Sequence, residues 1–226
     1  DEVEESTPLL KYGNTPILTR GNILTIIGKA KSCKTFLATA MAAAIGQDCL
    51  DIKAEGVERI VYIDTEQGKN RSILVEQRIY ALAGWSITEE KENIFMLSWR
   101  ELSSGIRRQM LDGIVAAYNP DLIILDGIRD LITDFNDVKE SSEIVNALMR
   151  ISEQGKCGIV TIIHQNKNDS NARGHCGSEL MNKSETVLAT IRENKITKVS
   201  CVMARGMEID DFYFHIVDGL PKPVSC

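Results

Sequence analysis

The sequence predicts an α/β fold: a three-layer sandwich with a mainly parallel central sheet and antiparallel strands at its C-terminal edge. Two observations predict the parallel part. The apolar runs are continuous and rich in β-branched residues, which is typical of strands covered on both faces, and helical patterns alternate with them, which indicates right-handed crossovers. The antiparallel edge is predicted because, after residue 184, short strands follow one another with only short turns between them.

The predicted elements follow each other along the chain as strands with helices between them, and then as strands alone. The strands of the first group are 22–27, 59–64, 94–97, 121–125 and 158–163. The helices between them are 34–45, 71–83, 105–118 and 141–154. The last strands are 186–192, 198–203 and 212–217.

Length, composition and charge fit one domain of ordinary size. The chain has 226 residues, of which 43% are hydrophobic and 26% charged, so it can bury a sizeable core. We expect residues 1–19, which hold Pro8, Gly13 and Pro16, to form an N-terminal arm, and residues 20–226 to form the domain. A formal net charge of −6 argues against a protein that coats nucleic acid with its whole surface, although it leaves room for a local basic loop or a basic channel formed on assembly.

Apolar runs and cysteines bear on where the protein resides. No run of about 18 apolar residues is present, so we expect no membrane span. The six cysteines form no Cys-x-x-Cys pair and join no histidine cluster, so they do not predict a zinc site. Cys157 and Cys201 lie in apolar runs, and we interpret the cysteines as reduced thiols of a cytoplasmic protein.

Residues 28–35 follow the first predicted strand and open the first predicted helix. Their sequence, Gly-Lys-Ala-Lys-Ser-Cys-Lys-Thr, fits the phosphate-loop pattern of Gly, four residues, Gly-Lys and Ser or Thr, except that Cys33 replaces the second Gly. Such a loop directs backbone N–H groups at phosphate oxygens, and the helix N-terminus adds a positive partial charge. Lys34 would then reach the β- and γ-phosphates of ATP, and the Thr35 hydroxyl would take one Mg²⁺ coordination site.

Cys33 is the irregular position of this loop. A Cβ where the backbone needs unusual angles costs about 1 kcal/mol, which a triphosphate site tolerates. The alternative is a lysine-rich strand-to-helix turn that binds no ligand, but the position after a buried strand and before a helix favours the phosphate loop. The residues expected to contact the nucleotide are Gly28, Lys31, Ser32, Cys33, Lys34, Thr35, Phe36 and Gln165.

Carboxylates follow two of the predicted buried strands. Asp126 ends an apolar run, which places it in the crevice where ligands bind such sheets, and there it would hold the Mg²⁺ shell, usually through water. Glu66 lies just past another strand and would orient and deprotonate the attacking water. Asp64 competes for that role, because strand alternation gives it the same facing, but Glu66 lies further out toward the crevice. Asp130 fits a cap or a surface residue better. The alternatives are a strand-ending Asp that starts a turn and loop carboxylates exposed to solvent.

His164 and Gln165 follow the last strand of the first group. Either would touch the γ-phosphate and report its loss to the loop beyond; a lone histidine at a strand end is otherwise more often structural. The loop 165–177 is polar and carries Lys167 and Arg173, so it would contact DNA or a neighbouring subunit. It has no aromatic residue for a stacking platform, and a plain surface loop fits it equally well.

Taken together, these residues resemble the RecA-like ATPases, and most closely the plasmid RepA and DnaB type of hexameric helicase, over residues 21–217. The Lys-Ala-Lys-Ser-x-Lys-Thr-Phe run is also similar to loops of ATPases carried on plasmids and mobile elements, in which the second loop Gly is often replaced. The resemblance implies a RecA-like fold that binds ATP and Mg²⁺. It implies nucleotide contact through Gly28, Lys34 and Thr35, a catalytic glutamate at Glu66, a metal-associated aspartate at Asp126 and a γ-phosphate sensor at His164, with Gln165 as a second candidate.

The resemblance also implies assembly. Members often complete the site of a neighbouring subunit with a basic residue from a C-terminal strand, and Arg205 stands about where that residue would lie. Such an arginine neutralises charge that develops on the transferred phosphoryl group. Arg173 is the other candidate, and Met203 occupies the place where many relatives have a Lys. We therefore expect a homo-oligomer, either a hexameric ring or a filament, that binds single-stranded DNA.

Functions of three kinds fit the sequence. The leading hypothesis is an ATP-hydrolysing motor or switch that acts on DNA. A small-molecule kinase would need an arginine-rich lid, and the Arg-poor span 127–163 argues against it. A nucleotide-gated adaptor or regulator with little turnover fits Cys33, the acidic balance and the lack of a Lys at position 203; it would lack DNA-stimulated ATPase activity.

Overall fold

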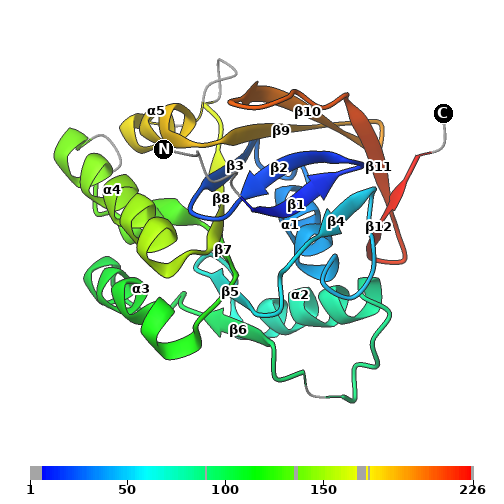
Figure 1. The fold of residues 1–226 in the computed structure, drawn as a ribbon, viewed down its shortest axis with the longest axis horizontal. Helices are drawn as coiled ribbons and strands as arrows, with labels where there is room; N and C mark the ends of the chain where they lie inside the picture. The colour runs from blue at the N-terminus through cyan, green and yellow to red at the C-terminus, as the bar shows by residue number, and fades with distance from the viewer. Residues whose placement is uncertain (1–6, 90, 135–136, 167–171, 173, 225–226) are drawn as a thin grey trace, which may run out of the picture.

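Strands and helices alternate through most of the chain. A computed structural model describes residues 7–89, 91–134, 137–166, 172 and 174–224, and Figure 1 shows its fold. The first strands of the main sheet are β3 (Ile23–Gly28), β5 (Ile60–Asp64), β6 (Ile94–Ser98), β7 (Leu122–Asp126) and β8 (Gly158–His164). The helices are α1 (Lys34–Ala43), α2 (Lys69–Leu82), α3 (Ser104–Tyr118), α4 (Val138–Gly155) and α5 (Gly174–Lys183), with a short 3-10 helix, η1 (Ile128–Leu131). The elements predicted in this part of the chain are confirmed with small shifts at their ends, whereas α5 was not predicted.

Local signals explain several helix ends. The Ser103 side chain caps α3 by accepting a hydrogen bond from the Ile106 N–H at 3.4 Å, and Asp137 caps α4 by accepting one from the Glu140 N–H at 2.7 Å. α3 ends at Asn119, which has a left-handed backbone (φ 44°) that helix C-termini favour.

The antiparallel edge of the sheet consists of the last strands. They are β9 (Thr186–Glu193), β10 (Ile196–Ala204), β11 (Phe212–Val217) and β12 (Leu220–Pro223). In the described residues the strand order is β12-β11-β10-β9-β3-β8-β7-β5-β6. This confirms the predicted architecture with one refinement: β9 itself runs parallel to β3, because α5 supplies a crossover between β8 and β9, and the antiparallel pairing starts at the β9–β10 hairpin.

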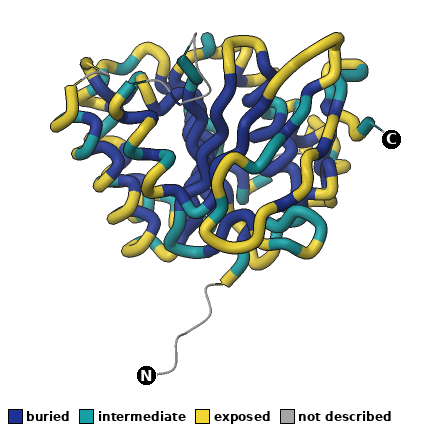
Figure 2. Tube along the Cα trace, turned by 90° about the horizontal axis from the view of Figure 1, so that it is seen from above, coloured by how far each residue is buried: buried dark blue, intermediate teal, exposed yellow. Residues whose placement is uncertain are grey.

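The core lies in two layers, one on each face of the sheet. On one face Leu24 and Ile26 of β3 pack with α1 and α2, and on the other face Ile23 and Ile27 pack with α3, α4 and α5. Figure 2 shows the buried strands between these layers. Burial on both faces explains why the parallel strands have continuous apolar sequences.

The N-terminal residues form a hairpin, not the predicted arm. β1 (Pro8–Tyr12) and β2 (Thr15–Thr19) pair with each other, and β1 also pairs with β4 (Ile52–Ala54), in a second sheet. Gly13, with φ 58°, permits the turn, and Pro8 is the first residue of its strand, so it removes no needed donor from the pairing. The segment is short and contains prolines, so its sequence did not show the alternation that predicts a strand. Four of its side chains are buried in the core: Leu9, Leu10, Ile17 and Leu18.

The hairpin is joined to the C-terminal half of the chain. The Tyr12 ring stacks on Phe212 of β11 with a centroid distance of 4.5 Å. The Thr19 N–H and hydroxyl donate to the two carboxylate oxygens of Glu185 at 2.7 and 2.9 Å. These contacts fix the hairpin against the main sheet.

The structure also bears on membrane-spanning helices and on the state of the cysteines. No helix in the described ranges has the length and apolar character needed to cross a bilayer. The cysteines of this part of the chain are free thiols: Cys33, Cys49, Cys157, Cys176 and Cys201.

Candidate nucleotide-binding site

The loop between β3 and α1 has the backbone geometry of a phosphate cradle. Cys33 caps α1 in the left-handed region, with φ 67° and ψ 26°, and Lys31 is left-handed as well, with φ 64°. Left-handed residues between right-handed ones turn successive N–H groups toward one concavity, which suits an anion. Cys33 therefore has the unusual backbone conformation expected at this position, in which its Cβ is sterically unfavourable.

Gly28 lets the loop approach the neighbouring strand. An ideal Cβ at Gly28 would lie 2.4 Å from both the Ser32 Oγ and the Thr190 Oγ1, and those two oxygens share a hydrogen bond of 2.7 Å. No side chain fits at Gly28 without moving β9 or the loop. Close packing against Ser32 and Thr190 thus explains why a glycine is required at position 28.

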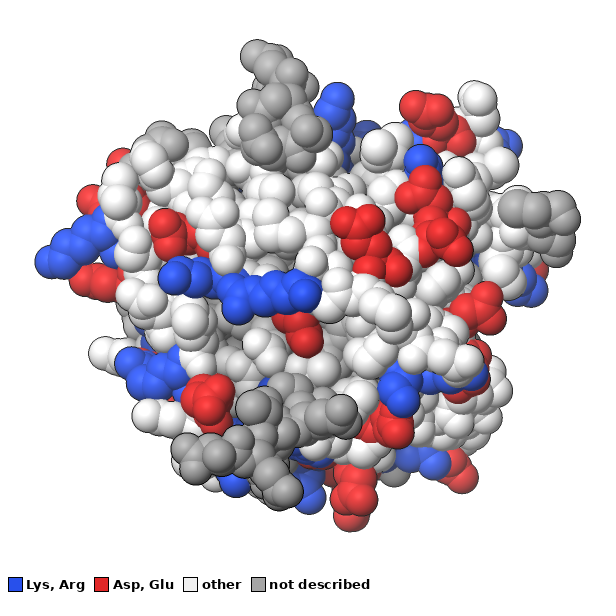
Figure 3. Space-filling view, turned by 45° about the horizontal axis from the view of Figure 1, so that its top comes forward, with Lys and Arg blue, Asp and Glu red and all other residues white. Residues whose placement is uncertain are grey.

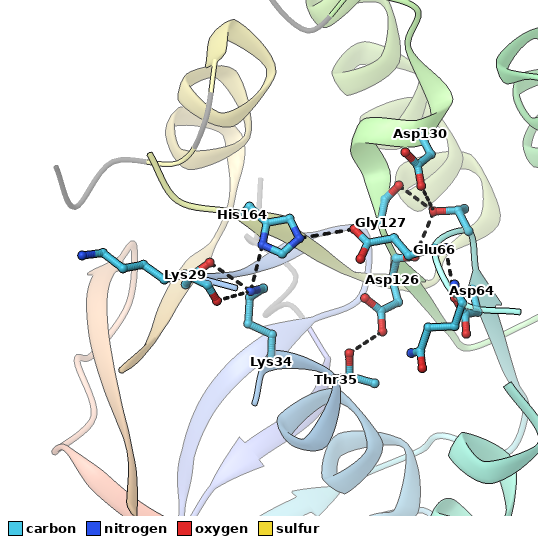
Figure 4. Close-up of polar contacts among 12 residues, drawn as sticks. Lys29, Lys34, Thr35, Asp64, Glu66, Asp126, Gly127, Asp130 and His164 are labelled. Carbon is cyan, nitrogen blue, oxygen red and sulfur yellow. Dashed lines mark hydrogen bonds and ion pairs between the residues drawn. The ribbon is translucent and has the colours of Figure 1, made fainter. Parts of the chain in front are cut away.

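Lys34 folds back onto its own loop. Its Nζ donates to the carbonyl oxygens of Gly28 and Lys29 at 2.9 and 2.8 Å and lies 3.2 Å from the His164 Nδ1 (Figure 4). Burial lowers the pKa of Lys34 to about 8, although the carboxylates of Glu66 and Asp126 act in the opposite direction. The cation therefore lies at the centre of the loop, next to both acidic side chains.

Thr35 and Asp126 form the pair expected for a magnesium site. The Thr35 hydroxyl donates to the Asp126 Oδ2 at 2.8 Å, and the buried Tyr62 hydroxyl donates to the same oxygen at 3.1 Å. In the described residues the Oδ1 accepts no hydrogen bond, so it can take a water of a cation. Burial raises the pKa of Asp126 to about 7 when no cation is present. A hard divalent cation with oxygen ligands fits this hydroxyl and carboxyl pair.

His164 links Lys34 to Glu66. The His164 Nε2 lies 3.5 Å from the Glu66 Oε1 (Figure 4). Because the Lys34 ammonium group can only donate, the Nδ1 facing it must accept, and the ring proton is then on Nε2, where it faces Glu66. This hydrogen bond lowers the pKa of the Glu66 carboxyl, which burial alone would raise.

One cavity of about 500 Å³ joins these residues. The sequence-predicted members of its lining are Lys31, Ser32, Cys33, Lys34, Thr35, Phe36, Glu66, Asp126 and His164. The main residues of its lining that sequence reasoning missed are Arg71, Arg78 and Arg192.

Most of the site lies within a region that matches a known family. A family model for an AAA domain, AAA_25, matches residues 1–170, which include the phosphate loop, Glu66, Asp126 and His164. The chain belongs to the AAA_25 family. A search of curated proteins found no match. Membership of this AAA family supports a P-loop ATPase that uses nucleotide, usually with Mg²⁺.

The carboxylates of Asp64 and Glu66, near the end of β5, have different surroundings in this AAA domain. Asp64 is fully buried, and its carboxylate accepts hydrogen bonds from the N–H groups of Glu66 and Gln67 and from the Ser72 hydroxyl, at 3.1, 2.9 and 2.9 Å. Asp64 therefore closes the turn from β5 into α2. Strand alternation predicted that the Asp64 and Glu66 side chains face the same way, and this prediction is wrong. Alternation stops applying where the strand ends, and only Glu66 reaches the cavity of the AAA domain.

Gly127 holds Glu66 close to β7. Its φ is 104°, and an ideal Cβ there would lie 2.2 Å from the Thr65 Oγ1 and 2.8 Å from the Glu66 Cγ. The Thr65 hydroxyl in turn donates to the Gly127 carbonyl at 2.8 Å and to the Asp130 carboxylate at 3.0 Å. Asp130 thus supports the turn beneath Glu66 through its contact with Thr65; it is neither the helix cap nor the exposed residue expected, since Gly127 caps η1 and Asp130 is half-buried.

Phe36 and Arg78 form the wall on the α1–α2 side. The Arg78 guanidinium lies over the Phe36 ring, 3.9 Å from its centroid, and its Nε donates to the Gly219 carbonyl at 3.0 Å. This is a flat cation–π surface held from two sides. Phe36 was predicted from its place after the loop, whereas nothing in the helical pattern of α2 shows which arginine reaches the cavity.

Arg205 and Gln165 are not brought into the cavity of this chain. Ala204 pairs with Thr186, at the opposite end of β9 from Thr190, which adjoins the phosphate loop. The Arg205 guanidinium donates to the carbonyls of Asn182 and Lys183 at 3.2 and 3.3 Å, at the C-terminal end of α5, where a cation is favourable.

Gln165 contacts the loop through its backbone, because its N–H donates to the Gly28 carbonyl at 3.1 Å. The candidates Lys167 and Arg173 lie outside the described residues. Part of the predicted loop 165–177 is instead helical, since α5 begins at Gly174 and buries Cys176 and Gly177.

Proposed function

We propose that the chain is an ATP-hydrolysing motor of the RepA type that acts on DNA. The observation that carries the proposal is the single cavity that joins Lys34, Thr35, Glu66, Asp126 and His164. These side chains come from the ends of different strands, so only the fold brings them together. Together they supply a phosphate cation, a metal ligand pair, a base and a polar contact for the terminal phosphate.

The proposed reaction is attack of water on the γ-phosphorus of ATP. Lys34 leaves the Gly28 and Lys29 carbonyls and binds the β- and γ-phosphates. Glu66 accepts a proton from the water as the new P–O bond forms and the bond to the β-phosphate oxygen breaks, which yields ADP and inorganic phosphate. Mg²⁺, when bound, neutralises charge on the phosphates, and Thr35 and Asp126 are the residues that would hold it.

The nucleotide base would pack near Phe36 and Arg78. Their stacked pair lies on the same cavity as the phosphate loop and presents a flat face of mixed apolar and cationic character. Such a face suits a purine ring, which every adenine nucleotide carries.

Action on DNA and assembly are the finer parts of the proposal. Figure 3 shows acidic and basic side chains interspersed over one face, as expected for a net charge of −6, so we propose that single-stranded DNA contacts a restricted region and not the whole surface. A ring or filament of this chain would supply that region, with Arg205 of one copy as the candidate finger for the next. Arg205 is exposed, which such a role requires.

The test is the ATPase rate with and without single-stranded DNA, for the wild-type chain and for Lys34→Ala and Glu66→Gln. We expect Lys34→Ala to lose nucleotide affinity and Glu66→Gln to bind nucleotide but hydrolyse it at least about 100-fold more slowly. Unchanged nucleotide affinity in Lys34→Ala would reject the loop assignment. Normal hydrolysis by Glu66→Gln would reject Glu66 as the base.

A nucleotide-gated regulator is the second candidate. Two observations favour it: the non-glycine residue Cys33 in a left-handed conformation, and the engagement of Arg205 with its own α5. A regulator of this kind would bind ATP with slow turnover that single-stranded DNA does not raise, whereas the motor would be stimulated by DNA.

A further inference from the structure

The first turn of α2 carries charges of the wrong sign for a helix start. Lys69 and Arg71 lie there, the turn has no acidic residue, and the Gly68 cap forms no side-chain hydrogen bond. Cations at a helix N-terminus oppose the helix dipole, so this placement is unfavourable for the helix. Within the described residues, neither side chain has a hydrogen bond or an ion pair to offset this cost. The fold itself therefore does not explain the placement, and a bound anion would.

The two cations of this turn face different cavities. Arg71 lines the cavity of about 500 Å³ that also holds Lys34, Glu66 and His164. Lys69 lines a neighbouring cavity of about 700 Å³, next to Arg100 and Glu101. The chain thus contains a natural comparison: two exposed cations on one helical turn, of which only Arg71 shares the cavity of the phosphate loop.

The other cations of the cavity have different places. Arg78 is committed to Phe36 and the Gly219 carbonyl, and Lys34 to its own loop. Lys31 lies on the loop and Arg192 near the end of β9, on the side of Thr190 and Ser32. Arg71 comes from the opposite side, because α2 starts directly after the turn that carries Glu66. Among the described cations that line this cavity, Arg71 is the uncommitted one on the side of Glu66, where water would attack.

We propose that Arg71 is a catalytic cation that contacts the γ-phosphoryl group of the nucleotide bound to its own chain. This rests on the proposed ATPase function and adds to it a charge-stabilising group in cis. Arg71 would stabilise negative charge on the transferred phosphoryl group as the bond to the β-phosphate breaks, with no change in its own protonation. The anion also removes the unfavourable interaction of Arg71 with the α2 dipole.

The first experiment compares Arg71→Ala with Lys69→Ala. For each we measure the dissociation constants of ADP and of the β,γ-imido analogue of ATP, and kcat for ATP. Arg71→Ala is expected to keep its ADP affinity, to lose roughly tenfold in affinity for the triphosphate analogue, and to lose roughly 100-fold or more in kcat. Lys69→Ala is expected to match wild type in all three, and Arg71→Lys to recover part of the loss because it keeps the charge without the planar fork. Equal ADP and analogue affinities in Arg71→Ala and wild type, with kcat within about twofold, would overturn the proposal.

A mixing experiment tests whether Arg71 acts in cis. Arg71→Ala and Lys34→Ala each lack a part of the site, and in an assembly that supplied Arg71 in trans, mixing them would restore activity at sites with an intact loop. We expect no restoration, and restored ATPase activity would overturn the cis assignment. The proposed ATPase function is tested separately. A wild-type chain that binds neither nucleotide would reject the function itself. If the wild type binds both nucleotides and Arg71→Ala has the same affinities and kcat, only the role of Arg71 is rejected.

Discussion

His164 holds the Glu66 carboxylate through Nε2 while its Nδ1 faces the Lys34 ammonium group, at 3.5 and 3.2 Å. One imidazole thus connects the phosphate-loop lysine to the base. A triphosphate that takes Lys34 away from the ring also removes the group that fixes the ring tautomer. We therefore expect nucleotide binding to free Glu66 for the attacking water, so that the base is restrained only when the loop is empty.

Replacing His164 tests this connection. We expect His164→Ala to bind ADP with affinity within a few fold of wild type and to lose about 100-fold in kcat, as is typical when one polar contact to the charge of the transition state is removed. Loss of the His164 hydrogen bond would raise the pKa of Glu66 in the nucleotide-free enzyme, so the acidic limb of the kcat/KM–pH profile should move to higher pH. His164→Asn, which keeps a donor, is the control. An acidic limb at the same pH in wild type and in His164→Ala would contradict the connection.

Gly127→Ala should slow hydrolysis without weakening ADP binding. The new methyl group would meet the Thr65 hydroxyl and the Glu66 Cγ, and the backbone φ of 104° is strained for any residue with a Cβ. A displacement of the base by about 1 Å costs on the order of 100-fold in rate. The matched control is Gly113→Ala on α3, where a Cβ meets nothing within 4 Å. A kcat for Gly127→Ala equal to that of Gly113→Ala would show that Glu66 does not depend on this contact.

Substitutions of Cys33 should follow backbone strain. Glycine adopts φ 67° freely and a β-branched residue does not, so we expect Cys33→Gly to retain nucleotide affinity and Cys33→Val to lose about 1–2 kcal/mol of unfolding free energy. Thermal unfolding and nucleotide titration of the two variants measure both effects. A Cys33→Val protein as stable as Cys33→Gly would mean that the left-handed cap is not retained in solution.

Lys34 should make the stability of the nucleotide-free protein pH-dependent. Its pKa falls from 10.5 to about 8 on folding because of burial, so between these values the unfolded chain binds more protons than the folded one. The unfolding free energy should therefore rise with pH across this window, by at most about 3 kcal/mol, with the penalty fully present below it. Lys34→Met should lack this contribution. Identical pH dependence of unfolding in wild type and Lys34→Met would show that Lys34 is not buried in the empty loop.

The sequence predicted those parts of the fold and site that depend on local pattern. Runs such as Leu122–Asp126 are strands because burial on both faces selects continuous β-branched residues, and the loop 28–35 was found because its chemistry fixes the spacing of Gly28, Lys34 and Thr35. The placement of Glu66, Asp126 and His164 around one cavity agrees with the expectation, and their catalytic roles stay predictions.

The features that the sequence did not predict depend on contacts between residues far apart along the chain. The β1–β2 hairpin is stabilised by packing Leu9 and Leu18 into the core, which its own short strands do not reveal. Sequence favoured Glu66 over Asp64 by depth alone, because the hydrogen bonds that hold Asp64 come from the next turn and from Ser72. Arg71 was missed for a similar reason, since a helical pattern gives no information on which polar side chain faces a cavity.

The contacts of Thr19 with Glu185 and of Tyr12 with Phe212 join segments that are far apart along the chain. Such contacts have high sequence separation, so they can form only when both halves of the chain have been synthesised. A chain shortened to begin at residue 20 would therefore leave Glu185 without its donors and expose the apolar residues beneath the hairpin. The first and last thirds of this protein should consequently unfold in one cooperative transition.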